Sequence, residues 1–220
     1  MIQFQNVSKH YENHTALRSL SFLIDKGEMV FVTGPSGSGK TTMLKLIYLA
    51  ERQDEGNVTV AGHETAKLKE SSIPMLRRNI GFVFQDFRLL HNRDVFENVA
   101  IALRIRGTHE KDIKARVFDS LKLVTLRHKS DSYPDALSGG EQQRVAIARA
   151  VVTEPTVILA DEPTGNIDPD LSAGIIRIFK DINAKGTTIL IATHNRDLFR
   201  DSGKRVLRLD SGNLVSDEVQ

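Results

Sequence analysis

A chain of 220 residues, 40% of them hydrophobic and 26% charged, can bury the core of one domain, and its net charge of +2 gives no electrostatic case for nucleic-acid binding. The absence of cysteine excludes disulfide-stapled folds and thiolate chemistry. The first residues lack the apolar core of a signal peptide and no apolar run approaches the roughly 20 residues of a membrane span, so we expect another molecule to provide any attachment to a membrane.

Short apolar segments alternate with amphipathic ones along the chain. Strands are predicted at 2–11, 28–33, 56–62, 80–85, 156–161 and 187–193. Helices are predicted at 42–50, 95–107, 112–124, 137–150 and 170–186. The last residues, 216–220, look like a frayed polar tail.

This order of elements predicts an α/β protein. Buried apolar strands that are separated by helices favour a parallel sheet with helices on both faces. We therefore expect residues 1–220 to form a single domain. The long helical stretch 86–152 interrupts the sheet and is interpreted as an inserted helical subdomain.

A glycine-rich loop follows the second predicted strand. GPSGSGKT, residues 34–41, matches the pattern G-x-x-x-x-G-K-[ST], in which glycines let backbone N–H groups approach phosphates at the start of a helix. Lys40 is expected to reach the β- and γ-phosphates, and the Thr41 hydroxyl to ligate Mg²⁺. The residues predicted to surround the phosphates are Gly34, Pro35, Ser36, Gly37, Ser38, Gly39, Lys40, Thr41 and Thr42.

Further polar candidates follow predicted strands. Asp161 is placed to hold Mg²⁺ and Glu162 to polarise an attacking water, although a strand ending in two solvated acids is common without any function. Gln85 and His194 can each hydrogen-bond a γ-phosphate or its water, and Gln85 is also a candidate metal ligand. The predicted catalytic residues are Glu162, His194, Gln85 and Lys40, and the predicted metal ligands are Thr41, Gln85 and Asp161.

The stretch LSGGEQQ, residues 137–143, opens another predicted helix. Ser138 and Glu141 have the spacing of a capping box, which explains the serine and the glutamate. It does not explain Gly139 and Gly140, because glycine destabilises a helix. Glycines fit if a phosphate approaches the backbone at the positive end of this helix.

Taken together, these motifs resemble the ATP-binding cassette (ABC) family over nearly the whole chain. Seven elements match in order: Tyr11 as the aromatic that stacks on adenine, the loop at 34–42, Gln85 of the Q-loop, the signature at 137–143, the VILADE strand at 157–162, the GNID loop with Asp168 at 165–168, and His194 as the switch histidine. For Tyr11, an exposed strand tyrosine is the plain alternative.

The resemblance implies a P-loop NTPase with a parallel core sheet, a small antiparallel β subdomain and a helical subdomain that carries the signature. It also implies Mg²⁺-dependent ATP hydrolysis by a homodimer. The loop at 34–41 supplies the residues for one nucleotide, so each ATP is expected between the phosphate loop of one chain and Ser138, Gly139, Gly140 and Glu141 of the other.

Residues 46–56 and 73–103 resemble more specifically a branch of the family that acts in bacterial cell division. Members of that branch pair with an integral membrane protein and control peptidoglycan hydrolases. This implies a cytoplasmic protein held at the inner face of the plasma membrane, with the partner docking near 86–103. Phe87, Leu89 and Leu90 are candidates for that surface, and a place in the core is the alternative.

Other functions remain open at this point. Lipoprotein-release and MacB-type export ATPases share much of the pattern, and a slow nucleotide-gated clamp would carry the same binding motifs. Glu162 favours turnover over a clamp. A cassette acting on DNA or ribosomes is disfavoured, because such proteins usually have a coiled-coil insertion or two cassettes in one chain, and this sequence has neither.

Overall fold

Two β-sheets organise the computed structural model, which describes residues 1–220 except for the side chains of residues 169 and 170. The larger sheet has the order β10-β9-β3-β8-β7-β6, in which all pairs are parallel except β10 with β9. Its strands are β3 (Met29–Thr33), β6 (Ile80–Val83), β7 (Val157–Asp161), β8 (Thr188–Ala192), β9 (Arg205–Asp210) and β10 (Asn213–Val219).

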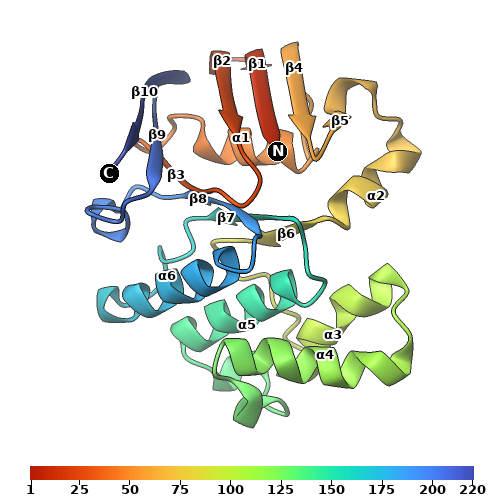
Figure 1. The fold of residues 1–220 in the computed structure, drawn as a ribbon. Helices are drawn as coiled ribbons and strands as arrows, with labels where there is room; N and C mark the ends of the chain where they lie inside the picture. Colours follow the sequence, from red (N-terminus) through yellow and green to blue (C-terminus); the bar gives the residue numbers. More distant parts are fainter.

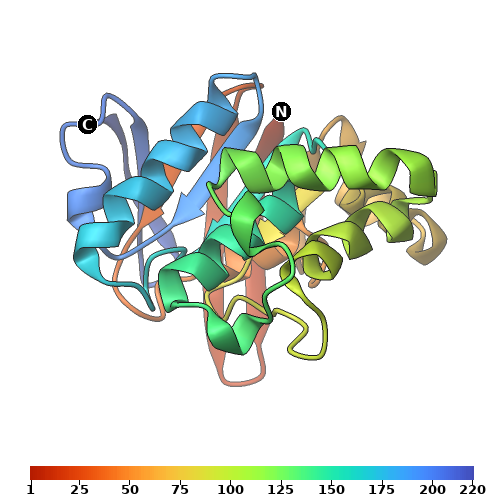
Figure 2. The ribbon, with the colours of Figure 1, turned by 90° about the horizontal axis from the view of Figure 1, so that it is seen from below.

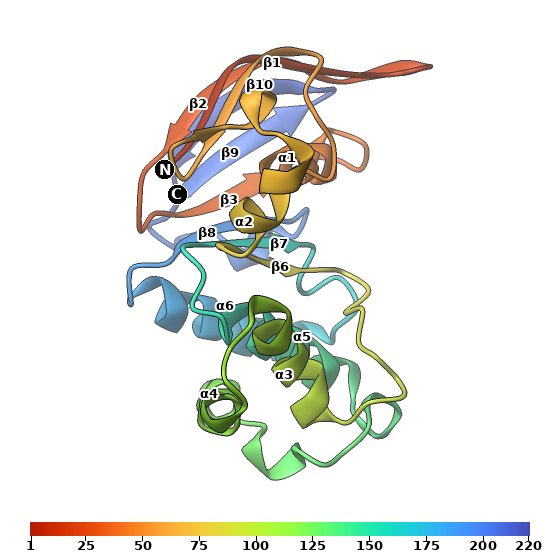
Figure 3. The same ribbon diagram turned by 90° about the vertical axis from the view of Figure 1, so that its right-hand side faces the viewer.

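The smaller sheet is antiparallel and has the order β2-β1-β4-β5. Its strands are β1 (Ile2–Tyr11), β2 (His14–Ile24), β4 (Glu55–Val60) and β5 (His63–Glu64). Figure 1 shows this sheet above the larger one, with most of the helices below. Figure 3 shows α1 (Lys40–Ile47) between the two sheets.

The remaining helices are α2 (Ile73–Arg77), α3 (Val95–Arg106), α4 (Glu110–Leu123), α5 (Gly139–Val151) and α6 (Pro169–Asn183). Short 3₁₀ segments lie at Thr65–Lys67, Glu70–Ser72, Arg127–Lys129, Pro134–Ala136 and Arg196–Leu198. Helices α5 and α6 lie against one face of the larger sheet, and α3 and α4 pack on the outer side of α5 (Figures 2 and 3). None of the helices in the described part of the chain combines the length and apolar character that crossing a bilayer requires.

The central strand β3 is apolar from Met29 to Val32 because both of its faces are buried. Met29 and Phe31 belong to the core shared with α3–α6, whereas Val30 and Val32 belong to the core shared with α1 and the small sheet. Successive side chains of a strand point to opposite faces, and both faces are buried. The loop that follows β3 therefore begins from a rigid strand.

The C-terminal residues contradict the prediction of a frayed tail. Residues 216–219 belong to β10, an edge strand that alternates between exposed and half-buried residues up to Asp217 and is exposed from there to Val219. Arg205 of β9 fixes it, donating to the Asp217 carboxylate at 2.6 and 2.7 Å while also pairing with Glu28 at 3.2 Å. Strands β2 and β9 were absent from the sequence prediction as well.

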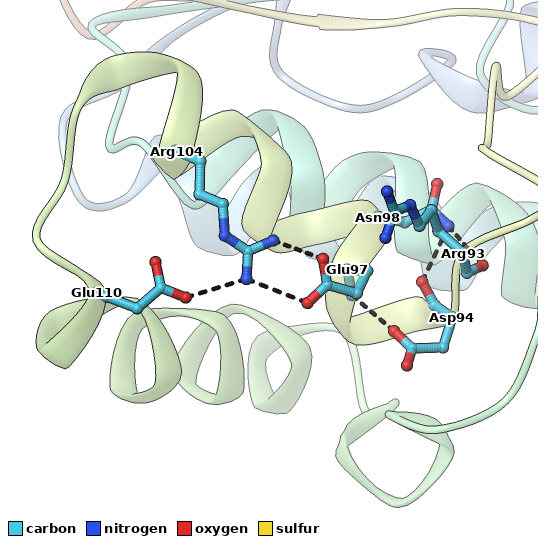
Figure 4. A network of polar contacts seen from close by, with 6 residues as sticks. All are labelled: Arg93, Asp94, Glu97, Asn98, Arg104 and Glu110. Carbon is cyan, nitrogen blue, oxygen red and sulfur yellow. Dashed lines mark hydrogen bonds and ion pairs between the residues drawn. The ribbon is translucent and has the colours of Figure 1, made fainter.

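Polar contacts fix the start of α3 and the loop before it (Figure 4). Asp94 caps the helix by accepting the Glu97 backbone N–H at 2.7 Å. The fully buried Asn98 accepts the Leu90 N–H at 2.7 Å and donates to the carbonyls of Leu90, Arg93 and Asp94 at 2.9–3.0 Å.

A second part of this network lies on the outer side of α3. Arg104 bridges Glu97 and Glu110, at 2.5 and 3.1 Å, and lowers the pKa of Glu97 through the hydrogen bond between them.

Leu89, in the loop before α3, is buried in the core. It therefore does not belong to an exposed docking surface, and of the three apolar candidates only Leu90 is exposed.

Candidate functional site

The loop between β3 and α1 needs glycine for steric reasons. Gly34, Gly37 and Gly39 have φ values of 152°, 79° and 104°, which side chains rarely adopt. A Cβ on Gly34 would lie 2.1 Å from the Leu209 carbonyl oxygen, and one on Gly39 2.5 Å from that of Ala16. The loop is thus packed closely against β9 and β2, and it leads into the positive end of α1.

Lys40 is the first residue of α1 and is almost completely buried. Its Nζ donates to the carbonyl oxygens of Gly34 at 2.8 Å and Pro35 at 3.0 Å, so the ammonium group is held against the loop. A phosphate bound by the loop would meet this charge at close range. The geometry therefore suits the role that the motif predicts for Lys40.

Thr41 and Asp161 form a candidate magnesium site. The Thr41 hydroxyl donates to Asp161 Oδ1 at 3.2 Å, which joins the start of α1 to the end of β7. Burial raises the pKa of Asp161, with the neighbouring Glu162 adding to the rise and the Thr41 hydrogen bond opposing it. A divalent cation at this place would favour the ionised carboxylate.

The Thr41 hydroxyl and the Asp161 carboxylate suit Mg²⁺, and they are too few to hold a metal without further ligands. Hydroxyl and carboxylate oxygens suit Mg²⁺, which usually keeps several waters and binds phosphate oxygens together with one or two protein ligands. No cluster of three or more His, Cys, Asp or Glu that could hold a metal is present among the described residues. The pair would therefore need nucleotide phosphates to complete the coordination.

Glu162 and His194 meet where the neighbouring strands β7 and β8 end. His194 Nδ1 lies 2.8 Å from Glu162 Oε1, and the His194 backbone N–H donates to Oε2 at 3.4 Å. The Glu162 backbone has a φ of 46°, a strained value for a glutamate, and its N–H donates to the Ala192 carbonyl at 2.9 Å. This turn holds the carboxylate towards His194.

Lys40, Thr41, Glu162 and His194 line one cavity of about 530 Å³, and Asp161 is joined to it through the Thr41 hydroxyl. It is lined by His14, Ala16, Pro35, Ser36, Gly37, Gly39, Lys40, Thr41, Thr42, Gln85, Glu162 and His194. The structure thus brings together most of the predicted phosphate-loop and catalytic residues. His14 was not predicted; its ring stacks on that of Tyr11 at 5.5 Å, and its place shortly after Tyr11 is the signal that sequence reading could have used.

The signature residues stand apart from this cavity. Ser138 Oγ accepts the Glu141 N–H at 3.3 Å and Glu141 Oε2 accepts the Ser138 N–H at 2.9 Å, so the capping box is present. That hydrogen bond is the main cause of the lowered pKa of Glu141. A Cβ on Gly139 would lie 3.3 Å from the Asn166 carbonyl oxygen, so close packing against the loop 165–168 is one reason for glycine here. Asp168 of that loop accepts the Ser172 hydroxyl through its carbonyl, at 3.3 Å.

The fold and the site together define an ABC-type ATPase. The family model for the ABC transporter matches residues 17–165, and the chain belongs to this family. The structure also resembles the dimeric bacterial ABC transporter cassette MJ0796, with a TM-score of 0.91 and 36% identity over 100% of this chain and 98% of that one. The predicted fold class and the prediction of an ATP-hydrolysing enzyme are confirmed.

Two further comparisons refine this assignment. A second structure of MJ0796, a dimeric post-hydrolysis state bound to ADP and Pi, has a TM-score of 0.90 and 35% identity, with 100% of this chain and 98% of that one covered. The chain is 49% identical to the cell division ATP-binding protein FtsE of Escherichia coli K12, over 97% of both chains. It is 48% identical to FtsE of Bacillus subtilis 168, over 99% of this chain and 96% of that protein.

Proposed function

We propose that this chain is the ATP-hydrolysing subunit of an FtsE-like complex, which binds Mg²⁺-ATP between two copies and drives an FtsX-type membrane protein in cell division. The observation that carries the enzymatic part is the convergence of the Thr41–Asp161 and Glu162–His194 pairs on the cavity beside Lys40. The names of the relatives support the cell-division role over lipoprotein release or MacB-type export.

Each residue of the site has a separate role in the proposed reaction. Lys40 would hold the β- and γ-phosphates, while Thr41, Asp161 and Gln85 would hold Mg²⁺, which would neutralise charge on the phosphate oxygens. Glu162 orients a water towards the γ-phosphorus and takes its proton as the bond to the ADP oxygen breaks. His194 holds the Glu162 carboxylate through Nδ1 and leaves Nε2 for the γ-phosphate or its water.

The two-chain site follows from the separation of the signature from the cavity. Ser138, Gly139, Gly140 and Glu141 do not line the cavity of their own chain within the described residues, which leaves them available to the nucleotide of a second copy. The dimeric relatives support this arrangement. Tyr11, with His14 stacked against it, provides the surface for adenine, and Asp168 lies in the loop beside the signature.

The helical subdomain 86–152 would carry the signature and one wall of the partner surface. A groove of about 380 Å³ lies between α2, β6, α3 and α5 and includes Phe82, Phe84, Ala102 and Ile105. Ile105 is 70% exposed. Arg77, Arg78 and Arg106 also line this groove. A cytoplasmic segment of the partner with apolar and acidic side chains would therefore complement it in both hydrophobicity and charge. Docking there would hold the protein at the inner face of the plasma membrane and link ATP turnover to peptidoglycan hydrolase control.

The docking proposal is tested by placing a charge in the groove. Ile105→Asp should abolish co-purification with the FtsX-type partner, because the carboxylate would be buried against apolar side chains. Val219→Asp is the matched control, since Val219 is 73% exposed on β10, away from the groove. Melting temperatures should show that both variants fold. Wild-type partner binding by Ile105→Asp would exclude the groove.

A further inference from the structure

The segment that carries Gln85 contains a strained turn. Phe87 and Arg88 have φ values of 56° and 49°, and two consecutive non-glycine residues in the left-handed region are unfavourable without outside support. The Arg88 N–H donates to the Asp86 carbonyl at 2.6 Å, which tightens the turn further. Some contact outside the turn must therefore stabilise it.

Arg149 of α5 provides that contact. One guanidinium nitrogen donates to the carbonyl oxygen of Arg88 and the other to that of Phe87, both at 2.6 Å. The planar fork of arginine suits two neighbouring acceptors. Burial lowers the pKa of Arg149, with the charge of Arg88 adding to this effect, so the guanidinium occupies this place despite an electrostatic penalty.

The segment around this turn also contacts the loop beside the signature and the groove proposed for the membrane partner. The Asn166 side chain, from the loop beside the signature, donates to the Gln85 carbonyl at 2.9 Å. Arg88 lies 4.0 Å over the ring of Phe84, and Phe84 and Arg149 both line the groove proposed for the membrane partner. The turn thus lies between the groove, the nucleotide cavity and α5.

We propose that Arg149 is a positioning residue that locks the Gln85 turn to α5, so that Gln85 and the signature at the start of the same helix move together. This inference rests on the proposed function of the two motifs. A partner seated in the groove would then shift the γ-phosphate contact and the signature at the same time. Loss of the lock should impair closure of the dimer but not the first binding of nucleotide.

The test uses Arg149→Met in a Glu162→Gln background, which is expected to retain ATP. Methionine keeps an aliphatic stem but cannot donate to either carbonyl. The ATP-dependent monomer–dimer equilibrium, measured by analytical ultracentrifugation, should weaken by at least about tenfold, as expected for lost hydrogen bonds to a charged donor. Affinity of the monomer for a fluorescent ATP analogue should stay within about twofold, because Arg149 does not line the cavity and the Lys40 contact with the phosphates is unchanged.

Arg116→Met is the matched control, since Arg116 is a helix arginine whose ion pair, with Glu154 at 3.2 Å, lies away from the turn. It should leave dimerisation unchanged. If the Glu162→Gln parent itself does not dimerise with ATP, the proposed function fails and the Arg149 inference falls with it. If the parent dimerises and Arg149→Met does so equally well, the inference alone is overturned.

A second variant covers the case in which Arg149→Met does not fold. Arg149→Lys keeps the charge but loses the fork, and native-state hydrogen exchange should become faster at the amides of residues 86–90 while the middle of α5 keeps its protection. Unchanged protection of residues 86–90 would overturn the lock. Equal loosening across α5 would also overturn it, because that result indicates a general structural role.

Discussion

Removing the Asn98 side chain should destabilise the protein by about 2–3 kcal/mol. Two backbone groups lose their only hydrogen-bond partner among the described residues in Asn98→Ala: the Leu90 N–H and the Arg93 carbonyl. The Leu90 and Asp94 carbonyls keep other donors, namely the N–H groups of Arg93 and of residue 98. Two unsatisfied buried groups would cost roughly 2–6 kcal/mol, but Leu90 and Arg93 are exposed enough for water to replace part of the loss.

Urea denaturation followed by circular dichroism measures this change directly. Asp94→Ala is the comparison, because it removes one capping bond at the same helix and should cost about 1 kcal/mol. Asn98→Ala should therefore be the more harmful of the two. If it destabilises the protein by no more than Asp94→Ala, the side chain does not fix the loop as the structure indicates.

Four other predictions concern the site. Lys40→Ala should weaken binding of a fluorescent ATP analogue about 10- to 100-fold through loss of a charged donor, whereas Glu162→Gln should bind normally and lower phosphate release by at least about 100-fold; normal phosphate release would exclude Glu162 as the base. The raised pKa of Asp161 means that the folded protein favours the protonated carboxyl more than the unfolded chain does. The stability that this preference contributes is fully present below the ordinary pKa of 3.8 and is lost as the pH rises through the raised pKa. Asp161→Asn should accordingly raise the melting temperature of the nucleotide-free protein at pH 7, and an unchanged or lower value would contradict this reasoning. Tyr11→Ala should weaken ATP binding about five- to tenfold while Tyr11→Phe keeps it, and equal losses would indicate that stacking is not the role of the ring.

The sequence predicted the parts of the fold that are apolar on both faces. The segments at 28–33, 156–161 and 187–193 became β3, β7 and β8, because strands buried on two sides need continuous apolar residues. Strand β10 was missed because none of its residues is buried and its last three residues are all exposed, so neither an apolar run nor an alternating pattern marks it. Asp217 is held instead by Arg205 of β9. Such a long-range ion pair has no local sequence signal.

The candidate site was likewise predictable from the sequence only in part. The glycine-rich loop was predictable because a short motif carries its whole geometry, including the positive φ values. The contact of Glu162 with His194 depends on the pairing of β7 with β8, which brings together residues far apart in the sequence. Arg149 was missed because its contacts with Phe87 and Arg88 join residues far apart in the sequence. His14 was overlooked although it follows Tyr11 closely in the sequence.

The most direct test of the central claim asks whether two chains build each nucleotide site. Lys40→Ala disables the phosphate loop, and Ser138→Arg disables the signature, so each variant alone should lack ATPase activity. A mixed dimer gathers both lesions into one composite site and leaves the other intact. Mixing the variants, after subunit exchange has been verified, should therefore restore part of the activity. The account is contradicted if a verified mixed dimer stays inactive while a covalently linked dimer with one intact composite site hydrolyses ATP.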